Sequence, residues 1–359
     1  MPGRAEGGKS RMATPRSQTR FRQEWRSPLS KPPLLDIRTL TRDYVSHSLF
    51  GAPHHTRALD DVSLTVDAGE IFGVVGESGC GKSTLARLVM ALDKPTSGHV
   101  LFDGDDLFSL QPKDLMRRRE NFQMVFQDPF GSLDPRQKVG RIVAEPLHVL
   151  ARKPGRAEIN DRVVDMLESV GLKAEHAERH PHEFSGGQRQ RIAIARALVT
   201  SPKLVVADEA VSALDLSVQA QVLNLLMDLR EKRGVTFLFI THNLAVVDCI
   251  ADRVGVMYRG RLVETGAAHE VFEQPLHPYT KVLADAGPSI ERFGRPQPSE
   301  RAPPPAPLSE PGGCAFRNRC PLAIARCAAE RPELRTITPG RQAACHRAEE
   351  MAARPPCTD

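Results

Sequence analysis

The 359-residue sequence predicts an α/β fold in which helices cover both faces of a parallel sheet. Short apolar runs that suit buried strands alternate along the chain with segments whose apolar residues recur at helical spacing. The predicted core strands are Ile71–Val75, Gln123–Phe126, Leu204–Ala207 and Phe237–Thr241. Each run leads into a polar residue or a Gly-rich loop, and ligands of parallel sheets bind at the carboxyl ends of the strands. We therefore expect the functional site at that edge of the sheet.

Two of the predicted helices carry an apolar stripe that ends at a glycine, Gly171 in one case and Gly234 in the other. Their apolar positions are Ile159, Val163, Met166, Leu167 and Val170, then Val218, Val222, Leu225, Leu226 and Leu229. Residues 34–104 instead contain short alternating runs separated by Gly and Asp. This second pattern predicts an N-terminal antiparallel β subdomain beside the parallel sheet.

The two ends of the chain differ in composition from its centre. Residues 1–33 carry eight Lys or Arg against two Glu, while the whole chain has a formal charge of +5. The pattern predicts a disordered basic tail on a near-neutral body, and no specific nucleic-acid surface. Residues 295–311 are Pro-rich and predict an extended linker before a Cys-bearing extension at 312–359. Since no long apolar run or secretory signal is present, we expect a cytoplasmic chain without a membrane span.

Residues 76–84 read Gly-Glu-Ser-Gly-Cys-Gly-Lys-Ser-Thr between a predicted strand and a predicted helix, which is a phosphate-binding loop in its required context. Glycines let successive backbone N–H groups face phosphate oxygens, Lys82 supplies a cation for the β- and γ-phosphates, and Ser83 supplies a hydroxyl for Mg²⁺. A chance Gly-rich turn is the alternative, and it does not account for the flanking strand and helix. We expect ATP and Mg²⁺ here, contacted by Gly76, Ser78, Gly79, Cys80, Gly81, Lys82, Ser83 and Thr84.

Polar residues follow three further predicted core strands. Asp208 and Glu209 follow one strand, and two adjacent acids suggest different tasks: Asp208 to hold Mg²⁺ and Glu209 to orient or deprotonate the attacking water. Gln127 and His242 follow two others, where Gln127 could sense Mg²⁺ and water and His242 could bind the γ-phosphate. The alternative for all four is an ordinary solvated strand end.

A second anion-binding pattern, Ser185-Gly186-Gly187-Gln188, opens a predicted helix at Arg189–Val199. A single nucleotide bound at the phosphate loop would not also need a second anion-binding helix N-terminus in the same chain. The simplest solution is a head-to-tail dimer in which each chain's second cradle covers the γ-phosphate bound by the other chain's phosphate loop.

These motifs together resemble the ABC ATPase family over residues 34–272, with a helical signature subdomain at about 128–200. Ser185–Gln188 is similar to its signature motif, Gln127 to its Q-loop, Asp208-Glu209 to its Walker B acids, residues 212–215 to its D-loop, and His242 to its switch histidine. The resemblance also implies that Tyr44 stacks on adenine. Phe184 and Ala210 depart from the commonest residues of the family at their positions.

Three more segments resemble the oligopeptide/dipeptide (peptide/nickel) importer branch: residues 126–136, His277-Pro278-Tyr279-Thr280 in the segment 273–311, and the Cys-bearing extension. The resemblance implies an ATPase subunit that powers uptake of peptides or a related small solute. It also implies a second ABC ATPase subunit, two transmembrane permease subunits and an extracytoplasmic solute-binding protein as partners. The location implied is the cytoplasmic face of the inner membrane.

Four cysteines of the extension, Cys314, Cys320, Cys327 and Cys345, have gaps of 5, 6 and 17 residues. Four thiolates could hold a tetrahedral metal or an iron–sulfur cluster, and the resemblance implies a [4Fe–4S] cluster in at least some members. Zinc and plain packing cysteines are the alternatives.

Two other functions compete with peptide import. A soluble ABC protein of DNA repair or translation would usually carry long coiled coils or two ATP domains, and an exporter ATPase would normally lack the segments at residues 130–136 and 277–280. We expect the chain itself not to identify the solute, because specificity resides in the partner subunits.

Overall fold

The computed structural model describes residues 32–46, 54–126, 129–286 and 312–353. The predicted basic tail up to residue 31, the Pro-rich linker, Gln127 and Cys357 lie outside these residues. Within the described part, no helix is long and apolar enough to cross a membrane.

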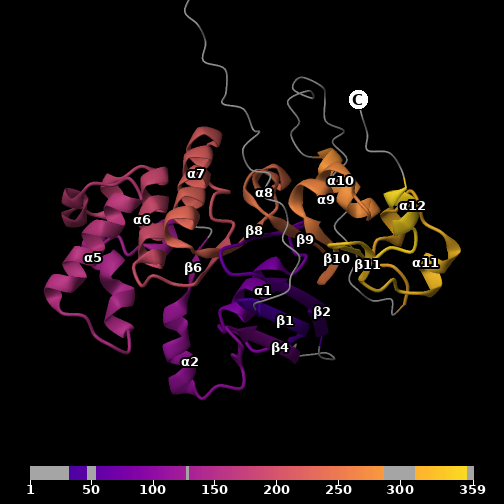
Figure 1. The fold of residues 1–359 in the computed structure, drawn as a ribbon, viewed down its shortest axis with the longest axis horizontal. Helices are drawn as coiled ribbons and strands as arrows, with labels where there is room; N and C mark the ends of the chain where they lie inside the picture. The colour runs from indigo at the N-terminus through magenta and orange to yellow at the C-terminus, as the bar shows by residue number, and fades with distance from the viewer. Residues whose placement is uncertain (1–31, 47–53, 127–128, 287–311, 354–359) are drawn as a thin grey trace, which may run out of the picture. The chain divides into compact units, whose positions relative to one another are not determined.

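An eight-stranded sheet forms the centre of the chain (Figure 1), with the strand order β11-β12-β10-β9-β3-β8-β7-β6. Its strands are β3 Ile71–Val75, β6 Phe122–Val125, β7 Leu204–Asp208, β8 Thr236–Thr241, β9 Arg253–Tyr258, β10 Arg261–Ala267, β11 Arg335–Thr338 and β12 Arg341–Ala343. The five strands from β9 to β6 pair in parallel, which confirms the predicted parallel core. β10, β12 and β11 then extend the sheet with antiparallel pairing, which the sequence pattern did not predict.

A second, four-stranded sheet is antiparallel, as expected for the N-terminal part, and has the order β2-β1-β4-β5. Its strands are β1 Leu35–Ser46, β2 His54–Val66, β4 Ser97–Phe102 and β5 Asp105–Asp106. The β9–β10 turn joins the two sheets, since the N–H of Asp60 on β2 donates to the Gly260 carbonyl at 2.8 Å.

The longer helices include both of those predicted from spacing. They are α1 Lys82–Val89, α5 Arg156–Ser169, α6 Gly186–Leu198, α7 Leu216–Arg233 and α10 Pro278–Ala286. The shorter ones are α2 Pro112–Arg118, α3 Pro129–Ser132, α4 Val139–Ala144, α8 Leu244–Ile250, α9 Ala268–Glu273, α11 Ala325–Ala329 and α12 Ala348–Ala352. α6 begins three residues before the predicted start at Arg189, because Ser185 caps it and the two glycines form its first turn.

The central sheet separates two apolar clusters, because alternate residues of each strand point to opposite faces. On β3, Ile71 and Val75 belong to the cluster under α6, α7 and α8, while Phe72 and Val74 belong to the cluster that includes α1 and the N-terminal sheet. Gly73 between them allows α8 to approach closely, since a Cβ there would lie 2.3 Å from Cγ1 of Val247. Both faces are therefore buried, as the continuous apolar strands predict.

The C-terminal extension continues this fold and shares its core. β12 pairs with β10, and Phe316 packs in the same apolar cluster as the central strands. Arg341 of β12 donates to Oε1 of Glu264 on β10 at 2.9 Å, and both side chains are buried. The Glu264 carboxylate also accepts the N–H groups of Leu276 and His277, at 2.8 and 2.9 Å.

We predict that Arg341→Met lowers the free energy of unfolding by roughly 3 kcal/mol, because it leaves the buried Glu264 carboxylate without its cation. Urea unfolding of the full chain measures this loss. The matched control is Arg326→Met, which removes an exposed extension arginine that pairs with Glu330 and should change stability by less than about 0.5 kcal/mol. Equal stability of the two variants would contradict an extension anchored through Glu264.

Candidate functional site

The phosphate loop connects the carboxyl end of β3 to α1, as predicted. Gly81 at the start of α1 has φ 107° and a Cβ there would lie 2.5 Å from the Ala58 carbonyl oxygen, so only glycine fits. At Gly76 a Cβ would lie 2.2 Å from the Met257 carbonyl oxygen. β2 and β9 therefore pack closely against the loop and fix its path. The backbone N–H groups of the loop then lie at the N-terminus of α1.

Lys82 is 5% exposed and lies along the loop that precedes it. Its ammonium donates to the carbonyl oxygens of Gly76 and Glu77, at 2.7 and 3.0 Å. These contacts hold the cation within the loop, where it adds to the partial positive charge of the helix N-terminus. The loop thus has the donors and the charge to bind phosphate groups.

Asp208 lies at the end of β7, beside Ser83 of the phosphate loop. Burial raises the pKa of Asp208, and a hydrogen bond with the Ser83 side chain opposes the rise. Its Oδ1 is buried without a hydrogen-bond partner among the described residues. A buried, unpaired carboxylate oxygen next to a hydroxyl is a donor set that suits Mg²⁺, so these two residues fit the predicted metal ligands.

Glu209 and His242 meet next to Asp208, although 33 positions separate them in the chain. Nδ1 of His242 lies 3.2 Å from Oε1 of Glu209. Glu209 has a φ of 48°, an unusual value for a residue with a side chain, and its N–H donates to the Ile240 carbonyl at 2.8 Å. Such strain often persists at functional sites because the surrounding structure holds it in place. The side chain of Glu209 is 18% exposed and that of His242 55%, so solvent reaches the pair.

Ser185 begins α6 with reciprocal hydrogen bonds of a capping box. Its hydroxyl accepts the Gln188 N–H at 3.4 Å, and the Gln188 side chain accepts the Ser185 N–H at 3.1 Å. Ser185 is exposed, and none of its hydrogen bonds with described residues reaches the phosphate loop of its own chain. The Ser185–Gln188 pattern therefore lies at an exposed helix N-terminus, and its role as a second cradle stays a prediction.

Tyr44 lies half-buried on β1 and has other contacts. Its hydroxyl donates to Asp93 at 2.8 Å, and the Arg42 guanidinium lies over its ring, 4.5 Å from the centroid. One ring face is thus covered, so a stack on adenine would use the other face. Gln127, predicted as a Mg²⁺ and water sensor, lies outside the described residues.

The four cysteines of the extension are partly or fully buried. Burial raises the pKa of Cys345 to about 11, and the charges of Cys314, Cys320 and Cys327 add to the rise. No disulfide joins any of the four to another described cysteine. Across the described ranges, however, no group of three or more His, Cys, Asp or Glu side chains is placed to hold a metal ion. As positioned here, the thiols do not fit the cluster that the resemblance implies.

Sequence patterns missed three contacts on the phosphate loop, all made by Glu77. Its N–H donates to the Tyr279 hydroxyl at 2.9 Å, and its carboxylate accepts both ends of the Arg319 guanidinium, at 2.8 and 3.0 Å. Tyr279 belongs to the motif at residues 277–280, which was recognised in the sequence as a family resemblance but was not assigned a contact. Nothing in the sequence marked Arg319.

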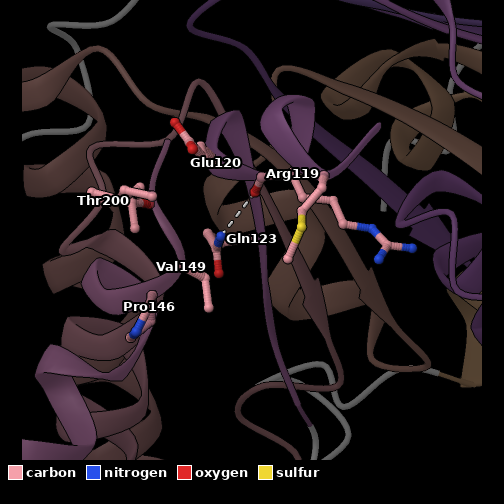
Figure 2. Close-up of a pocket in the computed structure, with 8 residues that line it drawn as sticks. Arg119, Glu120, Gln123, Pro146, Val149 and Thr200 are labelled. Atoms are coloured by element: carbon pink, nitrogen blue, oxygen red, sulfur yellow. Dashed lines mark hydrogen bonds between the residues drawn. The ribbon is translucent and has the colours of Figure 1, made fainter. Parts of the chain in front are cut away.

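A pocket of about 220 Å³ lies away from these residues, beside the amino ends of β6 and β7. Figure 2 shows Arg119, Glu120, Gln123 and Thr200 around it, with the Gln123 amide donating to the Arg119 carbonyl at 3.0 Å. Met116 and Val149 of the lining are 58% and 61% exposed. The pocket is therefore separate from the phosphate site and adjoins exposed apolar side chains.

A phosphate loop, a half-buried acid, and a Glu–His pair at one sheet edge define a nucleoside triphosphatase site. Residues 59–212 match the family model described as "ABC transporter". Residues 263–327 match the family model described as "Oligopeptide/dipeptide transporter, C-terminal region". The di/tripeptide transport ATP-binding protein DppF of Pseudomonas aeruginosa is 49% identical over 324 residues, which cover 89% of this chain and 98% of that relative. The dipeptide transport ATP-binding protein DppF of Haemophilus influenzae is 46% identical, with 87% and 96% covered. The chain belongs to the ATP-binding proteins of the ABC transporter family.

Solved structures share the fold. The ATP-binding cassette MJ0796, in a dimeric post-hydrolysis state bound to ADP and Pi, matches with a TM-score of 0.58 and 29% identity. That match covers 65% of this chain and 98% of the other. CbiO1 from Clostridium perfringens, part of the ABC transporter complex cbiONQ, matches with a TM-score of 0.59 and 30% identity, covering 67% and 91%.

We predict that Gly187→Ala destabilises the signature loop by about 1–3 kcal/mol, because the added Cβ would lie 2.3 Å from Cγ1 of Val218 on α7. Thermal unfolding of the variant measures the loss. The double variant Gly187→Ala/Val218→Ala should recover most of it, with Val218→Ala alone as the control. A double variant no more stable than Gly187→Ala would show that the close approach of α7 is not the reason for this glycine.

Proposed function

We propose that this chain is the ATP-hydrolysing subunit of an ABC importer that powers uptake of dipeptides, oligopeptides or a related small solute. The observation that carries the proposal is the convergence of Lys82, Ser83, Asp208, Glu209 and His242 at one edge of the sheet. Similarity to peptide transport ATP-binding proteins over 89% of the chain supports the importer branch.

In this proposal the phosphate loop binds the triphosphate of ATP, and Lys82 turns its ammonium from the loop carbonyls toward the β- and γ-phosphates. Ser83 and Asp208 would hold Mg²⁺, which supplies positive charge to the phosphate oxygens. The Oδ1 of Asp208 supports this role, because it has no hydrogen-bond partner in the described part of the chain and a cation would satisfy it.

Glu209 would orient the attacking water and accept its proton. His242, 3.2 Å from the Glu209 carboxylate, would fix that carboxylate and donate a hydrogen bond toward the γ-phosphate. The left-handed backbone at Glu209 supports the assignment, because residues held in such strained conformations cluster at functional sites.

Ser185 and the N–H groups of Gly186 and Gly187 would bind the γ-phosphate held by a second ABC ATPase subunit. The exposure of Ser185 and the dimeric state named for MJ0796 support a head-to-tail dimer. Closure around ATP would then depend on two chains, which couples hydrolysis to a change between open and closed dimers.

The remaining partners of the proposal are two transmembrane permease subunits and an extracytoplasmic solute-binding protein, with the chain on the cytoplasmic face of the inner membrane. The pocket in Figure 2 supports a permease contact at the amino edge of the sheet, because Met116 and Val149 expose apolar surface beside it. This edge lies opposite the phosphate site, so nucleotide and permease would contact the chain at different ends of the same strands.

A [4Fe–4S] cluster on Cys314, Cys320, Cys327 and Cys345 is a separate part of the proposal, and it rests on the family resemblance and on these four free cysteines of the extension. Their present positions require the thiols to move together upon binding. We predict iron, acid-labile sulfide and a visible absorption band in the full chain purified without oxygen. Cys345→Ser should lose all three, whereas Cys249→Ser, at an exposed cysteine outside the group, should keep them. Zinc or no metal in the unaltered chain would refute the cluster.

We predict that Glu209→Gln lowers ATP turnover at least about 100-fold, because the amide cannot accept the proton of water. ATP binding should persist, and the ATP-bound dimer should live longer. Phosphate release and size-exclusion chromatography with ATP and Mg²⁺ measure these effects. Glu231→Gln, at an exposed acid of α7, is the control. Turnover in Glu209→Gln equal to that control would remove Glu209 from the proposed role.

A further inference from the structure

We propose that Arg319 of the C-terminal extension is a positioning residue of the nucleotide site: it neutralises and holds Glu77, and so raises the affinity of the phosphate loop for ATP. The inference rests on the proposed ATPase function and adds a role for the extension. It starts from the two-point contact between the Arg319 guanidinium and the Glu77 carboxylate, at 2.8 and 3.0 Å.

Glu77 is the second residue of the phosphate loop, directly after Gly76. A carboxylate at this position opposes the binding of a triphosphate, because the two negative charges repel each other. A guanidinium that meets the carboxylate with two parallel hydrogen bonds offsets that charge and fixes its direction. The Glu77 and Arg319 side chains are 32% and 26% exposed, so solvent screens the pair only in part.

The backbone of Glu77 is held as well. Its N–H donates to the hydroxyl of Tyr279, whose side chain is fully buried. Its carbonyl accepts from Lys82 at 3.0 Å. Glu77 therefore links three parts of the chain, namely the phosphate-binding lysine, α10 and the extension, at the point where β3 becomes the loop.

Arg319 in turn is fixed by the extension around it. Phe316, three residues earlier, is 2% exposed and packs against Tyr258 and Tyr279, with ring centroids 5.4 Å apart in both pairs. The Arg319 guanidinium lies 5.6 Å from the Phe316 ring centroid and 6.0 Å from that of Tyr258. A short 3₁₀ turn, Arg317–Arg319, connects the two residues. The aromatic rings of Phe316, Tyr258 and Tyr279 therefore form a packed support from which the Arg319 guanidinium contacts the phosphate loop.

A purely structural role for the pair makes a different prediction from a positioning role. If Arg319 only joined the extension to the domain, its loss would lower stability without a selective effect on ATP. If Arg319 offsets the Glu77 charge, its loss should weaken ATP binding, and removal of the Glu77 charge should compensate. The second pattern is specific to the electrostatic role.

The test is titration of the full-length chain with a fluorescent ATP analogue and Mg²⁺, together with thermal unfolding of each variant. We expect Arg319→Gln to bind the analogue about 5- to 10-fold more weakly, a shift of the size found when a charged partner is removed. The double variant Glu77→Gln/Arg319→Gln should bind at least about threefold more tightly than Arg319→Gln alone. Arg319→Lys should retain part of the affinity because it keeps the charge. The deficit of Arg319→Gln should shrink at high salt.

Arg326→Gln is the matched control, since it removes an exposed extension arginine that pairs with Glu330. Analogue binding by Arg319→Gln equal to this control would overturn the proposal. So would a double variant as weak as Arg319→Gln, or an Arg319→Gln chain that fails to fold, because either result assigns Arg319 a role independent of the Glu77 charge. Absence of binding by the unaltered chain would instead overturn the proposed ATPase function.

Discussion

The parallel register of β3, β7 and β8 is the constraint on which the site depends. β3 pairs Val75 with Thr241 of β8, and β7 pairs Asp208 with Ile240. Buried strands must pair their N–H and C=O groups with their neighbours, so their ends cannot shift independently. The phosphate loop, the two acids and His242 follow these strand ends and therefore meet at one edge. The two apolar clusters on either side of the sheet stabilise this arrangement.

The site carries local energetic costs that the surrounding core must offset. Asp208 has a buried oxygen without a hydrogen-bond partner among the described residues, and burial raises its pKa, so the folded chain disfavours its charged form. Glu209 adopts a left-handed backbone that most side chains avoid. Both features suit a protein that binds a cation and a phosphate at this place, because ligands satisfy what the fold leaves unsatisfied.

The C-terminal extension is part of the nucleotide-binding structure. It adds β12 and β11 to the central sheet, buries Phe316 in the central core, and places Arg341 against the buried Glu264. The similarity to peptide transport proteins runs through this region as well as through the ATPase motifs. The shared core gives a physical reason why the two parts of the chain would remain together.

The sequence by itself determined the strand–loop–helix around Lys82, the two acids at the end of β7 and the capped start of α6. Phosphate binding requires consecutive backbone N–H groups and a fixed spacing of Gly, Lys and Ser residues, so a short stretch of sequence is enough to recognise it. The alternating ribbons and the apolar stripes before Gly171 and Gly234 were readable for the same reason, since strand and helix periods are local properties. The sequence also marked residues 277–280 as a motif, but gave them no role.

Only the tertiary structure decided which distant residues support the site. Arg319 reaches Glu77 across 242 positions and Tyr279 reaches it across 202, while His242 meets Glu209 across 33. It also decided that the extension joins the sheet in antiparallel fashion through β12 and β10. Such contacts depend on the path of the whole chain and on which faces pack together, so no local pattern of residues specifies them.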